Sequence, residues 1–163
     1  MDAGSPQLAI SRVFGAPRAL VYRAFTDPDQ LAAWWGPIGN SVPRDQIEFD
    51  VRPGGHQRWL EVSASEPDVR VHVHVDLTEV VDGELLEGVM HVSGQLPEGI
   101  EPFETRFRLE FHDEADGRTR LEIGQWLPEH MTRPSEHGWL EAFTKLDAML
   151  AGAQAGSKPT VEV

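Results

Sequence analysis

The sequence predicts an α+β fold in which a curved antiparallel sheet of about seven strands wraps around one long C-terminal helix, with two short helices after the first strand. Three observations support this prediction. Apolar and polar residues alternate along six successive segments after Val42, as they do in half-buried strands. Turn sequences rich in glycine, proline and aspartate separate these segments. Beyond Pro134, apolar residues recur at three- and four-residue steps, which is the spacing of a helix face.

The first strand is expected at Leu8–Phe14, a short apolar segment that Gly15 ends. Pro17 suits the first turn of the helix that follows, because proline lacks the N–H group that would have no partner there. Residues 20–25 then show the helical spacing of apolar side chains. The chain therefore begins with a strand and a helix, in that order.

A second, shorter helix is expected directly after the first. Asp27 has a side chain that caps helices, and Pro28 follows it in the first helical turn. The helix ends at Trp34-Trp35-Gly36-Pro37, where glycine and proline interrupt it. This ending leaves two adjacent tryptophans beside a turn.

Antiparallel strands occupy the middle of the chain. Pro53-Gly54-Gly55, Asp82-Gly83 and Asp116-Gly117 are turn sequences that join neighbouring strands as hairpins, whereas 96–102 contains two prolines and a glycine and is expected to be a loop. The alternation of apolar and charged residues is clearest at 103–112. The expected strands are 42–51, 56–64, 71–78, 85–94, 103–112 and the segment after Gly117 that carries Leu121 and Ile123.

The last helix opens at Pro134 and Ser135 and ends the single domain, which we expect to span 8–150. Flexible segments are expected at 1–7 and at 151–163, where the composition turns to small and polar residues. A strongly twisted sheet curls, and one helix laid across its concave face cannot fill the space with side chains. The sequence therefore predicts a pocket between sheet and helix.

Composition excludes several classes of function. The formal net charge of −13 would repel nucleic acid and anionic membrane surfaces, so neither is expected as a partner. The absence of cysteine removes disulfides, thiolate metal sites and cysteine nucleophiles. No apolar run is long enough to cross a bilayer, and the first residues do not resemble a signal peptide. We expect a cytoplasmic protein without membrane insertion.

Several motifs together resemble those of one known superfamily. The chain is similar to the START-like (SRPBCC) superfamily, in the branch named after the activator of heat-shock protein 90 ATPase. The resemblance implies the helix-grip fold, a deep cavity between sheet and C-terminal helix, and commonly a bound apolar or aromatic small molecule. The residues that carry it are Ala16-Pro17, Thr26-Asp27-Pro28, Leu31, Trp34-Trp35-Gly36-Pro37, Arg52-Pro53-Gly54-Gly55, Thr119-Arg120-Leu121 and Gly138-Trp139.

The functions of that superfamily are diverse, so the resemblance implies a ligand-binding cavity but does not identify the ligand. Its members include lipid and hormone carriers, polyketide cyclases, ring-hydroxylase subunits, co-chaperone domains and self-resistance proteins. The eukaryotic co-chaperones carry a further N-terminal domain that these 163 residues do not include, and we therefore expect no heat-shock protein partner.

Large apolar side chains are the candidate ligand-binding residues, because aromatic faces give a flat ligand a large contact area. The alternative for each of them is ordinary core packing. Trp34, Trp59 and Trp126 are the preferred candidates because they lie near element ends or turns. The candidates are Trp34, Trp35, Trp59, Met90, Phe103, Phe107, Trp126, Trp139 and Phe143.

Gln125 is the candidate polar residue of the pocket. It shares the face of Leu121 and Ile123, and a buried amide needs a hydrogen-bond partner. That partner is either a ligand carbonyl or a backbone turn.

Three histidines allow two chemical hypotheses. His72 and His74 share one strand face and could supply two imidazoles to a metal. No third ligand is evident at a sequence spacing typical of metal sites, so no metal site is expected. His72, His74 and His91 could instead line the cavity and move a proton in a cyclase, with His74 and His91 as the candidate catalytic residues. The valine stripe at Val71, Val73 and Val75 favours histidines that point to solvent.

Charged residues on the strands have structural explanations. We expect ion pairs of Arg58, Arg106 and Arg108 with Glu61, Glu104 or Glu110, because charges that alternate with apolar residues mark a solvated sheet face. The acidic segment 113–117 lacks the ligand spacing of a calcium loop and is expected to be a surface turn.

The function that the sequence favours is binding of a small apolar or aromatic molecule in the cavity, as a carrier or in sequestration or resistance. The protein is then not a conventional enzyme, and no cofactor is expected. The alternatives are a polyketide cyclase or dehydratase of natural-product biosynthesis and a co-chaperone-like interaction module. The oligomeric state is left as monomer or homodimer.

Overall fold

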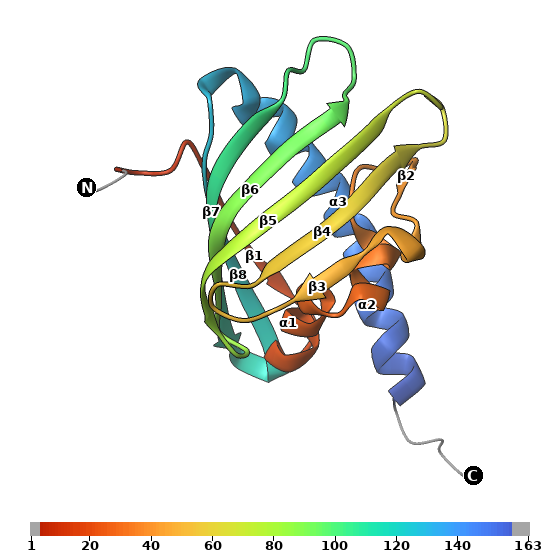
Figure 1. Ribbon diagram of the computed structural model, residues 1–163. Coiled ribbons are helices and arrows are strands. Elements are labelled where there is room, and N and C mark those ends of the chain that lie inside the picture. The colour runs from red at the N-terminus through yellow and green to blue at the C-terminus, as the bar shows by residue number, and fades with distance from the viewer. Residues whose placement is uncertain (1–3, 158–163) are drawn as a thin grey trace.

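A curled antiparallel sheet wraps around one face of a long C-terminal helix in the computed structural model, which describes residues 4–157 (Figure 1). The sheet has eight strands in the order β1-β8-β7-β6-β5-β4-β2, and β3 also pairs with β4. The α+β helix-grip prediction is confirmed. The strands are β1 (Leu8–Phe14), β2 (Asn40–Ser41), β3 (Glu48–Asp50), β4 (His56–Ser63), β5 (Arg70–Val81), β6 (Leu85–Gln95), β7 (Phe103–Glu114) and β8 (Arg118–Trp126).

Two short helices follow β1, as predicted: α1 (Arg18–Thr26) and α2 (Pro28–Trp34). Pro17 precedes α1 as its cap residue, one position before the first turn in which the sequence placed it. Asp27 caps α2, and its Oδ1 accepts a hydrogen bond of 2.9 Å from the Asp29 N–H. The helix ends at Trp34, after which Trp35 is extended. The two adjacent tryptophans therefore point in different directions.

The strand expected at 42–51 is mostly absent, which corrects that prediction. Between residues 40 and 51, the only segments that pair with β4 are β2 and β3, and a short 3₁₀ turn, η1 (Arg44–Gln46), separates them. Pro43 explains the interruption, because its ring fixes φ at −61° and it has no N–H to donate to a neighbouring strand.

The last helix, α3 (Thr132–Ser157), begins two residues before Pro134 and continues beyond Leu150. A 3₁₀ turn, η3 (Glu129–Met131), leads into it, as another, η2 (Ala115–Gly117), joins β7 to β8. Of the two segments expected to be flexible, 1–3 and 158–163 lie outside the described residues. Their flexibility stays a prediction.

Two glycines allow backbone segments to approach closely where the sheet bends. A register shift between Leu77 and Glu79 interrupts the pairing of β5 with β6. A Cβ added to Gly88 there would lie 2.2 Å from the Asp76 carbonyl oxygen, and one added to Gly55 would lie 2.0 Å from the Asp50 carbonyl oxygen. Only glycine fits either position.

The core lies between the concave face of the sheet and the helices, and the convex face is charged. Thus Val73, Val75 and Leu77 of β5 are buried, whereas His72 and Asp76, which point to the other face of the strand, are exposed. Within residues 4–157, none of the helices combines the length and apolar character that crossing a bilayer demands.

Candidate functional site

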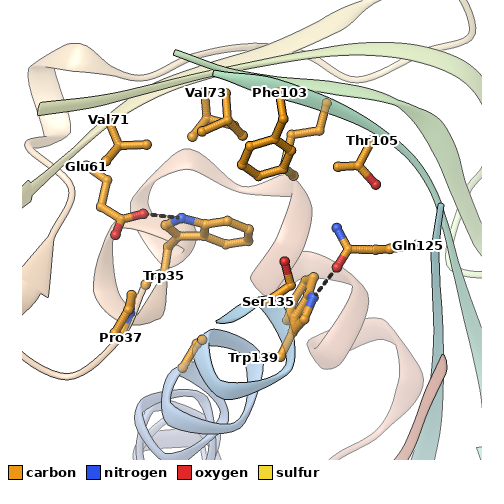
Figure 2. A pocket seen from close by; sticks show the side chains of 15 residues that line it. Trp35, Pro37, Glu61, Val71, Val73, Phe103, Thr105, Gln125, Ser135 and Trp139 are labelled. Carbon is orange, nitrogen blue, oxygen red and sulfur yellow. Dashed lines mark hydrogen bonds between the residues drawn. The ribbon is translucent and has the colours of Figure 1, made fainter. Parts of the chain in front are cut away.

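A cavity of about 160 Å³ lies between the concave face of the sheet and the first turns of α3 (Figure 2). Strands β4 to β8 supply its wall, α3 its floor, and the turn after α2 one side. Most of its lining is apolar. The lining residues are Trp35, Gly36, Pro37, Glu61, Val71, Val73, Met90, Val92, Phe103, Thr105, Gln125, Ser135, Gly138, Trp139 and Ala142.

Trp35 is the aromatic residue that divides this space. Its ring makes edge contacts with Trp59 at a centroid distance of 4.9 Å and with Trp139 at 5.6 Å. Behind it lies a second hollow of about 20 Å³, the space of roughly one water, which Trp35, Gln125 and Trp139 also line.

Gln125 and Trp139 form the polar end of the cavity. The indole N–H of Trp139 donates a hydrogen bond of 2.9 Å to Gln125 Oε1 (Figure 2). Both residues are buried, since Gln125 is 4% and Trp139 8% exposed. The hydroxyl of Thr105 in the same wall donates to the carbonyl of Arg106. Among the lining residues, the one charged side chain is that of Glu61, on β4.

Glu61 fixes the side of the cavity that the α2 turn forms. Its Oε1 accepts a hydrogen bond of 3.0 Å from the Trp35 indole, and its Oε2 accepts one from the Asn40 amide. Both carboxylate oxygens are thus engaged by the protein. Glu61 positions Trp35 from the strand, across the cavity from Gln125 (Figure 2).

Lys145 fixes the same turn from α3. Its ammonium donates to the carbonyl oxygens of Trp35, Pro37 and Asn40 at 3.0–3.2 Å. Burial lowers the pKa of Lys145 from its usual value, and the carboxylate of Glu61 opposes that shift, as does that of Glu141. The turn that carries Trp35 is therefore bonded on both sides, to a strand and to a helix.

The structure brings together most of the residues that the sequence singled out as ligand candidates. Trp35, Met90, Phe103, Gln125 and Trp139 line the main cavity. Trp59 and Phe107 line the small second hollow behind Trp35.

Trp34, Phe143 and Trp126 lie outside both lining sets. Trp34 is 0% exposed and its indole donates to the Ala24 carbonyl, because α2 turns it into the core. Phe143 packs edge-on against Phe14 in the core. Trp126 points to the convex face, where the guanidinium of Arg106 lies 4.2 Å from its ring centre.

Sequence reasoning missed Glu61 as a cavity residue and Lys145 altogether. Both had a signal. Glu61 shares the strand face of Trp59, which predicts an inward carboxylate rather than the solvated ion pair that the sequence suggested. Lys145 is a lysine at helical spacing from Gly138 and Ala142, which line the cavity, and so it falls on the covered face of α3.

The expected ion pairs form on the convex face with partly different partners. Arg58 pairs with Glu48, and Arg106 with Glu87 at 3.1 Å. Arg108 pairs with Glu87 and, along its own strand, with Glu110. The bond from Arg108 lowers the pKa of Glu110. Apart from Arg108–Glu110, these pairs span neighbouring strands in the manner of a solvated sheet face.

The histidines lie on the convex face, away from the cavity. His74 Nε2 is 2.9 Å from Asp76 Oδ1, and His91 Nε2 is 3.2 Å from Asp76 Oδ2. His91 Nδ1 also lies 3.1 Å from a Glu104 oxygen. This arrangement follows the valine stripe, which points inward and leaves His72, His74 and His91 outward.

The carboxyl group of Asp76 titrates below its usual pKa because of these histidines. The hydrogen bond from His74 lowers the pKa most, desolvation opposes it, and His91 adds to the lowering. A lowered folded-state pKa stabilises the fold above the usual carboxyl pKa, and this stabilisation is lost as the pH falls through the lowered value.

Replacing His74 by alanine is expected to raise the pKa of Asp76 part of the way to its usual value, since His91 remains. A pH titration of the Asp76 carboxyl carbon by NMR measures this change. His112→Ala is the matched control, because His112 bonds Glu110 on the same face. An Asp76 pKa that does not respond to loss of His74 would refute the assignment.

Comparison with known proteins identifies relatives of the whole fold. The profile of the family described as "Activator of Hsp90 ATPase homolog 1-like protein" matches residues 15–151. Protein CV1439 from Chromobacterium violaceum is 25% identical, covering 88% of this chain and 95% of that one, with a TM-score of 0.75. The AHSA1 protein from Silicibacter pomeroyi is 24% identical. The match covers 88% of this chain and 96% of that one, with a TM-score of 0.70.

A more distant solved structure is DynU16, a protein in the dynemicin biosynthetic locus. It is 19% identical, with 88% of this chain and 46% of that one covered and a TM-score of 0.63. At this level of identity, the comparison shows a shared fold and nothing further. A comparison with curated proteins finds no match.

Proposed function

The chain belongs to the Activator of Hsp90 ATPase homolog 1-like family, and on that premise we propose that it binds a small apolar or aromatic molecule between its sheet and α3. The observation that carries the proposal is the cavity of about 160 Å³ with its mostly apolar lining. A cavity of about 150 Å³ lined by apolar side chains accommodates benzene in another protein. The size therefore suits an occupant of one or two rings.

Burial of the ligand supplies the affinity. An aromatic molecule that buries about 200 Å² of apolar surface gains about 5 kcal/mol before the costs of ordering. Stacking against Trp35, Phe103 and Trp139 adds to this gain. A gain of about 5 kcal/mol corresponds to a dissociation constant of about 0.2 mM, so we expect affinity in the submillimolar range. Carriage or sequestration of the ligand in the cytoplasm is the role that we propose.

The cyclase hypothesis receives less support from the positions of the titratable groups. His74 and His91, its proposed proton shuttles, lie on the convex face and contact Asp76. Glu61 lines the cavity, but both of its oxygens already accept hydrogen bonds from the protein. A general base must reach a substrate proton, so the container role is the better explanation.

The test is a thermal-shift and tryptophan-fluorescence screen with neutral one- and two-ring aromatic compounds, natural-product fragments among them. A ligand at about 100 times its dissociation constant stabilises the fold by about 2.7 kcal/mol, which raises the melting temperature by about 5 °C or more. The emission of Trp35 and Trp139 should change on binding, since both line the cavity. If every compound leaves both signals unchanged, the proposal fails.

A further inference from the structure

We infer that the occupant of the cavity is an uncharged aromatic molecule with a carbonyl or similar hydrogen-bond acceptor, and that the side-chain amide nitrogen of Gln125 recognises this acceptor. The inference rests on the proposed binding function and names the class of ligand. It follows from the orientation of one amide, the solvation of its nitrogen and the distribution of charge around the cavity.

The orientation of the Gln125 amide is determined by its neighbour. An indole N–H can only donate a hydrogen bond, so the atom that faces Trp139 must be the amide oxygen. The amide nitrogen then points the other way. Figure 2 shows it turned toward the space bounded by Thr105, Phe103 and Trp35.

The amide nitrogen of Gln125 faces the cavity and has no hydrogen-bond partner among the described residues. Among residues 4–157, no acceptor makes a hydrogen bond with this Nε2, although the side chain is only 4% exposed. This nitrogen is not one of the fully buried polar atoms without a partner, so it can be reached from the cavity, where a donor without an acceptor is available to a ligand. Thr105 does not compensate, because its hydroxyl donates to the Arg106 carbonyl. A hydrogen-bond acceptor on the ligand would pair with the amide nitrogen of Gln125.

The charges around the cavity favour a ligand whose hydrogen-bond acceptor is uncharged. Glu61, a carboxylate, lines the cavity and would repel an anionic ligand. Lys145 could have attracted one, but its ammonium donates to three backbone carbonyls and it is absent from the lining. The net charge of −13 also disfavours an anionic ligand. A ketone, aldehyde, ester or quinone fits these conditions better than a carboxylate.

The experiment compares matched ligands on the unaltered protein by calorimetry or tryptophan fluorescence. Indane and 1-indanone share a two-ring skeleton and differ by one carbonyl group. We expect 1-indanone to bind about tenfold more tightly, as one neutral hydrogen bond to a buried donor allows. Indane-1-carboxylate is expected to bind more weakly than either compound, because of Glu61.

Substitution of Gln125 then tests the residue. In Gln125→Leu the preference for 1-indanone over indane should disappear, while indane still binds. Gln125→Met is a second variant of similar length, in case leucine disturbs packing beside Trp139. Gln95→Leu makes the same chemical change at an exposed position at the end of β6 and should keep the preference.

The outcomes separate the two proposals. If neither indane nor 1-indanone binds, and the wider aromatic screen also fails, the binding function itself is wrong. Equal binding of the two compounds by the unaltered protein leaves the function standing and overturns the role of Gln125. A preference that persists in both Gln125 variants overturns it as well.

Discussion

Replacing Trp34 by alanine is expected to lower the free energy of unfolding by about 3–5 kcal/mol, a large part of the stability of a small domain. Trp34 is 0% exposed, and its ring contacts Phe25 at a centroid distance of 4.8 Å. Its indole N–H also donates a 2.8 Å hydrogen bond to the Ala24 carbonyl, which the substitution would leave unpaired. Urea denaturation followed by circular dichroism measures the loss.

Trp126→Ala is the matched control, since it removes the same side chain from the convex face. Its ring contacts Arg106, and its indole donates to the Gly4 carbonyl, so the expected cost is about 1 kcal/mol. Ligand binding should be unaffected in this variant. Comparable losses of stability in the two variants would contradict the assignment of Trp34 to the core.

Replacing Gly138 by leucine is expected to weaken binding of aromatic compounds more than tenfold without loss of stability. Gly138 lines the cavity on the face of α3 that also presents Ser135, Trp139 and Ala142. A Cβ added there meets no atom within 4 Å, so the new side chain would occupy ligand space. Because glycine is a poor helix former, leucine should stabilise α3 by about 0.5–1 kcal/mol.

Gly152→Leu provides the control for this prediction. It makes the same substitution in the same helix, also with no atom within 4 Å of the added Cβ, at an exposed position outside the cavity. It should gain a similar stability and keep full binding in isothermal titration calorimetry. Undiminished binding by Gly138→Leu would mean that ligands occupy another part of the protein.

Period-two alternation predicted the sheet well, because the pleat of a strand fixes which face each residue takes. The valine stripe at Val71, Val73 and Val75 favoured an outward direction for His72 and His74, although the alternation alone also allowed them to line the cavity; the structure has them on the convex face. The same reasoning failed at 42–51. There the apolar spacing was correct, but Pro43 and the 3₁₀ turn η1 leave only β3 paired. Apolar spacing alone does not report which backbone groups are hydrogen-bonded.

The choice between Trp34 and Trp35 could not be predicted from the sequence. The two residues are adjacent, and the chain leaves helical geometry between them. One therefore packs in the core against Phe25, whereas the other faces the cavity. The direction of each depends on the last turn of α2 and on bonds from Glu61 and Lys145, which are distant in sequence.

The pairing of β1 with β8 has a consequence for biosynthesis. Leu8 lies opposite Gln125 and Phe14 opposite Thr119, so the earliest strand acquires its neighbour only after most of the chain has left the ribosome. Until then the apolar side chains of β1 lack their final cover, a situation that invites chaperone binding or aggregation. Completion of the fold during translation must await the emergence of the last strand.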